Sequence, residues 1–277
     1  PGNTPALLAR FRNVGSTTAP AFEQLDTNWL ALSDYSLESV ALAFGDLDGD
    51  GDDDLILGDE LGNLHRWENT ADLGEDMALV LTEASMPDAA GTAIDVGQFA
   101  TPCLYDLDAD GDLDLLVGEK NGGLSLFENT GSVNAPSFTF LTAAAGQVDA
   151  DNLLGINGFP VPAVWPTDSG LTLVIGNELG HLQLYAFPPS PMEEPEAEWT
   201  EVTDQWLGLY EGEFAAPALG DLDADGTYDL VVGVRNGGLT LWNGHALEPA
   251  LLGCTPDVIN VIDHLEPPTQ GWQPYPN

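Results

Sequence analysis

Short apolar runs recur along the chain, and each is followed by a glycine-containing turn and a second run in which apolar and polar residues alternate. This pattern occupies residues 55–69, 115–129, 173–185 and 230–243. An apolar run, a tight turn and an alternating run together predict a β-hairpin. No helical period is sustained in these segments, so the pattern predicts short antiparallel strands.

Each hairpin is flanked by two further strand-like segments. A fourth strand is predicted at residues 22–25, 79–82, 138–141 and 199–202. A strand that enters the next unit carries a Phe-x-x-Pro sequence at residues 99–102, 159–162 and 214–217. One unit therefore consists of four short antiparallel strands, and Asp46 and Asp106, which are 60 residues apart, give the length of the repeat.

A fixed period of four strands predicts the blades of a β-propeller. A single four-stranded sheet leaves both faces uncovered, whereas blades stacked around an axis bury both, which explains central runs that are almost wholly apolar. We therefore predict an all-β protein whose propeller spans residues 1–243, with repeats at about 41–82, 98–142, 158–203 and 214–243.

The two ends of the chain leave the closure of the ring open. Residues 6–25 form a half-repeat that is available to close it, and residues 244–277 form a tail that packs on the ring or completes it. In one arrangement the half-repeat completes the last blade. In a second, residues 250–262 supply the first half of a split fifth blade, and in a third, earlier blades have been cut away. Pro256 also suits the start of a short helix.

Three of the four units contain a nine-residue acidic loop between their first two strands. The loops are residues 46–54, 106–114 and 221–229, with carboxylates at positions one, three, five and nine and glycine at position six. Carboxylates this close together repel one another unless a cation lies between them, and oxygen ligands on a short loop suit Ca²⁺. The glycine permits the sharp turn, and the backbone carbonyl of position seven is the natural fifth donor.

A solvated acidic turn without an ion is the alternative for any single loop, and the threefold repetition argues against it. An EF-hand is excluded, because that loop needs a glutamate at position twelve. Position twelve is Leu57, Val117 or Val232. In the third unit the four carboxylate positions are Val164, Pro166, Asp168 and Thr172, so no ion is predicted there.

Net charge and the lack of a long apolar segment exclude two classes of partner. The chain has 46 acidic and 5 basic residues and a formal net charge of −41, which excludes nucleic acids and anionic membrane surfaces. No apolar run approaches the ~20 residues of a membrane helix, so membrane insertion is not predicted. The chain starts at Pro1 without a signal peptide, and we expect a processed form.

Calcium sites also predict where the protein acts. Free Ca²⁺ is millimolar outside cells, so we expect a secreted, cell-surface or periplasmic protein. Cys103 and Cys254 either pair there as a disulfide or remain two buried free thiols.

The acidic loops and their flanking strands closely resemble the FG-GAP/VCBS repeats, which occur in integrin α-subunit propellers and secreted bacterial proteins. The resemblance includes the Phe-Glu-Asn-Thr-Gly sequence that follows at residues 127–131. The resemblance covers about residues 6–243 and implies calcium in the loop between the first two strands of a blade. By position, the implied ligands are Asp46, Asp48, Asp50, Asp52, Asp54, Asp106, Asp108, Asp110, Asp112, Asp114, Asp221, Asp223, Asp225, Thr227 and Asp229.

Catalytic groups are sparse. The histidines, which are His65, His181, His245 and His264, show no shared register and are predicted at the surface. A bound ion would hold the loop carboxylates ionised and so oppose general-acid chemistry. Lys120 and Arg235 lie in equivalent hairpin turns, where a small anion site is conceivable. No enzymatic activity is therefore predicted.

We expect a non-enzymatic, secreted, calcium-binding propeller that acts as a protein–protein interaction, adhesion or surface-assembly module. Long connections at residues 71–92, 143–157 and 188–205 are the expected partner surface, because loops on a rigid scaffold commonly carry binding. The alternative is a carbohydrate-binding module or a polysaccharide-active enzyme, for which Trp29 and Trp206 are the expected surface contacts.

Overall fold

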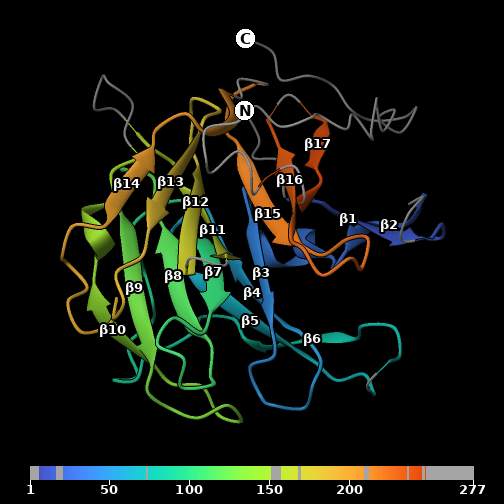
Figure 1. Ribbon diagram of the computed structural model, residues 1–277. Coiled ribbons are helices and arrows are strands. Elements are labelled where there is room, and N and C mark those ends of the chain that lie inside the picture. Colours follow the sequence, from blue (N-terminus) through green and yellow to red (C-terminus); the bar gives the residue numbers. More distant parts are fainter. Residues whose placement is uncertain are drawn as a thin grey trace, which may run out of the picture.

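Four antiparallel sheets follow one another along the chain in the computed structural model (Figure 1). The structure describes residues 6–16, 21–72, 74–150, 157–167, 170–208, 212–235, 237–244 and 247. Blade 1 contains β3 (Ala41–Gly45), β4 (Asp54–Gly58), β5 (Leu64–Asn69) and β6 (Leu79–Glu83). Blade 2 contains β7 (Thr101–Tyr105), β8 (Asp114–Gly118), β9 (Leu124–Asn129) and β10 (Phe138–Thr142).

The other two blades repeat this order. Blade 3 contains β11 (Val161–Thr167), β12 (Gly170–Gly176), β13 (Leu182–Ala186) and β14 (Thr200–Thr203). Blade 4 contains β15 (Ala216–Gly220), β16 (Asp229–Gly233) and β17 (Leu239–Trp242). Three single-turn 3-10 helices lie in the connections: η1 (Leu32–Tyr35), η2 (Ala145–Gln147) and η3 (Trp206–Gly208).

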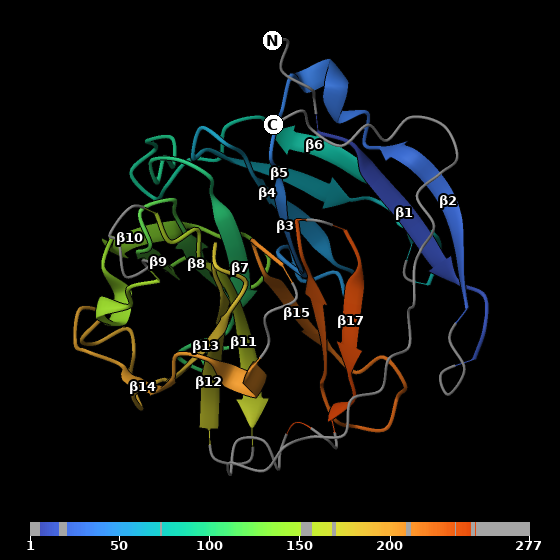
Figure 2. The ribbon, with the colours of Figure 1, turned by 90° about the horizontal axis from the view of Figure 1, so that it is seen from above.

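The blades are arranged radially, with β3, β7, β11 and β15 innermost (Figure 2). From β3 to β15, each of these first strands packs against the first strand of the next blade. The predicted fold class, an all-β propeller of antiparallel four-stranded blades, is therefore confirmed, with four blades of which the fourth has three described strands.

The second strand of each blade is buried on both faces, as its apolar sequence predicts. In β8, Leu115 and Val117 pack into the cluster shared with blade 1, whereas Leu116 packs into the cluster shared with blade 3. A third cluster joins blades 3 and 4 and includes Leu247 of the C-terminal tail. Because full burial of one leucine contributes about 1.5–3 kcal/mol, packing between blades is the main source of stability.

The third unit lacks the acidic loop because its first two strands are longer. β11 and β12 each have seven residues, and their pairing continues to Thr167 opposite Gly170. A tight hairpin therefore replaces the loop that connects these strands in the other blades. Asp168, the carboxylate that remains in this unit, lies outside the described residues.

The N-terminal half-repeat forms a two-stranded sheet of its own, with β1 (Leu8–Asn13) paired to β2 (Phe22–Trp29). It packs on blade 1, where Leu8 joins the cluster of Leu32, Leu55 and Trp67. In the described part of the chain it is not paired with β17, so it does not extend the sheet of blade 4. Residues 250–262 and Pro256, on which the other predicted arrangements depend, lie outside the described residues.

Glycine ends the second strand of every blade, and in the first three blades the backbone of the next blade approaches it closely. A Cβ atom at Gly176 would meet the carbonyl of Ala215 and the ring of Pro217. At Gly233 of blade 4 the nearest atom to such a Cβ is Leu239 Cδ2, at 3.5 Å. Neither glycine has a positive φ, so the two positions differ in the room around the Cα atom and not in this feature of the backbone.

We predict that Gly176→Ala lowers the free energy of unfolding by about 1–3 kcal/mol, because the added methyl group forces blades 3 and 4 apart. Gly233→Ala is the matched control and is expected to change it by less than about 0.5 kcal/mol. Urea denaturation in millimolar calcium measures both variants. Equal effects in the two variants would show that the contact between blades is not what requires glycine.

Candidate metal sites

The three acidic loops have the same backbone course. Each connects the first and second strands of its blade, and its last aspartate is the first residue of the second strand. Position six is a glycine with φ of 95°, 99° and 92° at Gly51, Gly111 and Gly226. Glycine adopts this conformation without steric cost. The preceding turn reverses the chain, so that the carboxylates of positions one and three converge with that of position five in blades 1 and 4 and with that of position nine in blade 2.

Position one is fixed by hydrogen bonds from the loop backbone. In blade 1 the two carboxylate oxygens of Asp46 accept hydrogen bonds from the backbone N–H of Gly49, at 2.7 Å, and of Gly51, at 3.0 Å. The equivalent glycines, Gly111 and Gly226, donate to Asp106 at 3.2 Å and to Asp221 at 3.0 Å. Position five accepts in the same way from the backbone N–H of position seven, at 2.8–3.1 Å. These bonds hold the carboxylates side by side.

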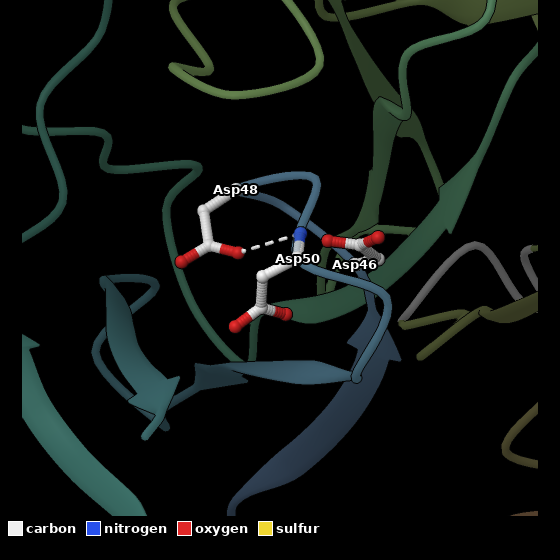
Figure 3. A group of neighbouring side chains, drawn as sticks. All are labelled: Asp46, Asp48 and Asp50. Atoms are coloured by element: carbon white, nitrogen blue, oxygen red, sulfur yellow. Dashed lines mark hydrogen bonds between the residues drawn. The ribbon is translucent and has the colours of Figure 1, made fainter. Parts of the chain in front are cut away.

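Each loop brings three carboxylates together with ligand oxygens within 4.8 Å of one another. Figure 3 shows the group in blade 1, where the carboxylates of Asp46, Asp48 and Asp50 lie around one space. The other groups are Asp106, Asp108 and Asp114, and Asp221, Asp223 and Asp225. All three loops that the sequence predicted as metal sites therefore have the geometry to hold a cation.

Each loop also contains one buried carboxylate oxygen that accepts no hydrogen bond from the described residues. These atoms are Oδ1 of Asp52, Asp112 and Asp223. A buried acceptor left without a donor costs about 1–3 kcal/mol, and a bound cation removes that cost. The donors present are all oxygens, which fits Ca²⁺ or Mg²⁺ rather than Zn²⁺. The residues therefore fit the predicted calcium.

At position seven, the structure offers a side-chain oxygen as a further candidate metal ligand. From the sequence, this position was expected to offer its backbone carbonyl. In blades 1 and 2 the side chains of Asp52 and Asp112 also supply the buried oxygens just described. In blade 4, the Thr227 hydroxyl donates to Asp225 Oδ1 at 2.6 Å, and the oxygen without a donor belongs to position three.

Position nine has a structural role that the sequence did not reveal. Asp54, Asp114 and Asp229 are only 1%, 1% and 2% exposed. Their Oδ1 atoms accept hydrogen bonds at 2.8–2.9 Å from the backbone N–H of Asn69, Asn129 and Gly244, each fifteen residues later. The carboxylate thus connects the metal loop to the end of the third strand. In blade 2 it also belongs to the group of three carboxylates that could hold a cation.

Burial and crowding make these carboxylates costly to ionise in the absence of a cation. Burial is the main cause that raises the pKa of Asp114 to about 7; backbone N–H groups oppose the rise, and the neighbouring Asp108 and Asp112 contribute to it. Burial also raises the pKa values of Asp48, Asp112 and Asp229, and each has neighbouring aspartates that act in the same direction. A divalent ion would reverse this preference.

Two predictions about surface residues are wrong. Trp206 is only 3% exposed and packs on Trp165 at a centroid distance of 5.5 Å, so it is a core residue. The side chain of His65 is 11% exposed, and its two nitrogens lie 2.7 Å from the Ala84 carbonyl and 3.0 Å from Asp59 Oδ2. His65 therefore fixes a turn.

The remaining candidates for chemistry are also engaged in structure. Lys120 Nζ lies 5.8 Å from the Phe99 ring centroid, and Arg235 Cζ lies 5.1 Å from that of Phe214. Cys103 is a free thiol whose burial raises its pKa to about 11, so it is a poor nucleophile. His245, His264 and Cys254 lie outside the described residues. Among the described residues, no helix has the length and apolar character of a membrane span.

Comparison with known proteins gives no family and only distant structural matches. No protein-family model matches the chain, and no curated protein matches it. Among solved structures, it is similar to a lectin from Agrocybe aegerita that recognises non-reducing terminal N-acetylglucosamine, with 16% identity and a TM-score of 0.45. It is also similar to BBS1N in complex with ARL6DN, with 21% identity and a TM-score of 0.33. The matches cover 82% and 74% of this chain but only 55% and 54% of the others, so this chain spans about half their length.

Proposed function

We propose that the chain is a calcium-binding propeller of the FG-GAP/VCBS type that is secreted or displayed at a cell surface and binds a protein partner without catalysis. One observation carries the calcium assignment. Each of three loops contains a group of three carboxylates and, in the same nine residues, a buried carboxylate oxygen with no donor among the described residues. Three repeats of one arrangement favour a common ligand over three chance clusters.

Calcium would brace each loop against the repulsion of its own carboxylates. In blade 1 the ion would be held by Asp46, Asp48, Asp50 and Asp52, and the equivalent residues would hold it in blades 2 and 4. Extracellular placement follows from this proposal, because millimolar calcium saturates even sites of modest affinity.

A binding role is supported by the structural roles of the residues that were candidates for chemistry. His65 and Cys103 are engaged in turns and core. The connection between β13 and β14, residues 187–199, lies on a rigid ring, and loops of this kind commonly carry partner surfaces. The proposal therefore assigns the chain to adhesion or surface assembly, with carbohydrate binding as the alternative.

Calorimetric titration of the full chain with calcium tests the ion sites. The wild type is expected to bind three ions, and the double variant Asp106→Asn/Asp108→Asn is expected to bind two. Probing arrays of extracellular proteins and of glycans, each with and without calcium, then separates the two binding roles. Titration that shows no calcium binding at all would overturn the proposal.

A further inference from the structure

Blade 1 carries an arginine at a position where the other three blades carry leucine. Arg66 pairs with Ile56 across β4 and β5, in the register that places Leu126, Leu184 and Leu241 opposite the second strands of their blades. Leu126 and Leu184 are fully buried in the clusters shared with the next blade. Arg66 therefore occupies the interface between blades 1 and 2 in place of a core leucine.

The side chain of Arg66 is largely buried, and one of its N–H groups has no partner among the described residues. Its side chain is 14% exposed, and one nitrogen donates to Asp54 Oδ2 at 3.0 Å. The Nε–H group is buried and has no acceptor among the described residues. A guanidinium has five N–H donors. The buried Nε–H group of Arg66 is therefore a donor that a ligand could satisfy.

A cavity of about 210 Å³ lies next to this guanidinium. Arg66 lines it together with Glu83, which is opposite Arg66 in the strand pairing and so lies on the same face of the sheet. The apolar part of the lining is formed by Met86, Pro87, Pro136 and Phe138. No hydrogen bond from a described residue engages the Glu83 carboxylate, so the cavity presents unused donors and an unused acceptor between apolar walls.

Charge decides what kind of ligand fits. Glu83 and Asp88 both line the cavity and the chain has a net charge of −41, so an anion is repelled. A cation such as an ammonium group has no acceptor for the Arg66 N–H groups. A neutral group that accepts a hydrogen bond from Arg66 and donates one to Glu83 satisfies both side chains. A carboxamide does so, because it carries a strong acceptor oxygen and N–H donors in one small planar group.

We propose that this cavity between blades 1 and 2 binds a carboxamide of a protein partner, such as an asparagine or glutamine side chain. The amide oxygen accepts from the Arg66 guanidinium, and the amide N–H donates to Glu83. The aliphatic part of the side chain packs on Met86 and Pro136. This assignment rests on the proposed protein-binding function and names where on the ring the partner is held.

Propionamide serves as the probe, with propionate and glycerol as controls. The chain has four arginines and three methionines, so the Arg66 Nε–H and Met86 methyl resonances are readily resolved by NMR. Propionamide is expected to shift both resonances saturably while those of Arg10, Arg12 and Arg235 stay unchanged. Propionate and glycerol are expected to produce no saturable shift.

Arg66→Leu is the matched variant, because leucine is what the other blades carry at this position. It is expected to weaken propionamide binding at Met86 roughly tenfold or more, as loss of a charge-assisted hydrogen bond requires. Glu83→Ala is expected to weaken it as well. Equal shifts with propionate or glycerol, no shift with propionamide, or undiminished binding in Arg66→Leu would overturn the assignment. These measurements need no partner, so their failure is separable from failure of the proposed function.

Discussion

In excess chelator, the protein is expected to unfold at a far lower temperature than in millimolar calcium. Each ion that binds only the folded chain adds roughly 2.7 kcal/mol when its concentration is 100 times Kd. The three loops lie in different blades, so their contributions are expected to add, giving roughly 8 kcal/mol in total. That is comparable with the whole stability of a typical domain, which is about 5–15 kcal/mol.

Scanning calorimetry with and without chelator measures this effect directly. Asp106→Asn/Asp108→Asn removes two of the candidate ligands of blade 2 and is expected to reduce the calcium-dependent gain by about one third. Blade 3 provides the internal control, because its hairpin has no acidic loop, and Thr167→Ala should leave the calcium-dependent gain unchanged. An unfolding temperature that is the same in chelator and in calcium would show that the loops are not metal sites.

The blades could be predicted from sequence because their determinants are local. Apolar second strands, glycine turns and alternating third strands recur at one spacing, and β4, β8 and β12 have the burial that this pattern implies. The acidic loops were predictable for the same reason, since their geometry depends on a few consecutive residues. Gly51 and its equivalents adopt the backbone conformation that the sharp turn requires.

Features that depend on distant contacts were not predictable in this way. The Asp114 carboxylate accepts a hydrogen bond from the backbone N–H of Asn129, fifteen residues later. The sequence predicted Asp114 only as a metal ligand and did not indicate this bond. Trp206 lies in a connection, where a surface position was the simpler expectation, but Trp165 of blade 3 covers it. The sequence also did not show which blade the N-terminal half-repeat packs against, because the sheets have similar edges and the outcome depends on long-range pairing and packing.

Arg66 shows how the repeat itself reveals an exception. Alone, an arginine on an alternating strand would be assigned to the solvent-facing side. Aligned with Leu126 and Leu184, it stands at a position that is buried in blades 2 and 3. The departure from the repeat was present in the sequence, but its significance required the cavity and the ion pair with Asp54.

The stability of the chelated protein is expected to fall as the pH rises from 5 to 8. The folded pKa of Asp114 is about 7, above its ordinary value of 3.8, because burial penalises its charge. A raised carboxyl pKa contributes stability that is complete below about pH 4 and is lost as the pH rises through 7. The difference of about three pKa units corresponds to at most roughly 4 kcal/mol. Hydrogen bonds outweigh burial and lower the pKa of Asp59. The stability that Asp59 contributes is therefore lost only at pH values below the range from 5 to 8.

With calcium present, the trend is expected to reverse over the same range. The ion binds deprotonated carboxylates, so its affinity and its contribution to stability grow as protons leave the loops. Denaturation by urea at pH 5, 6.5 and 8, with calcium and with a chelator that remains effective at each pH, measures the two profiles. Asp114→Asn is expected to flatten the profile in chelator, because the amide does not titrate. Parallel profiles with and without calcium would show that the carboxylates of these loops do not exchange protons for an ion, whatever else the loops do.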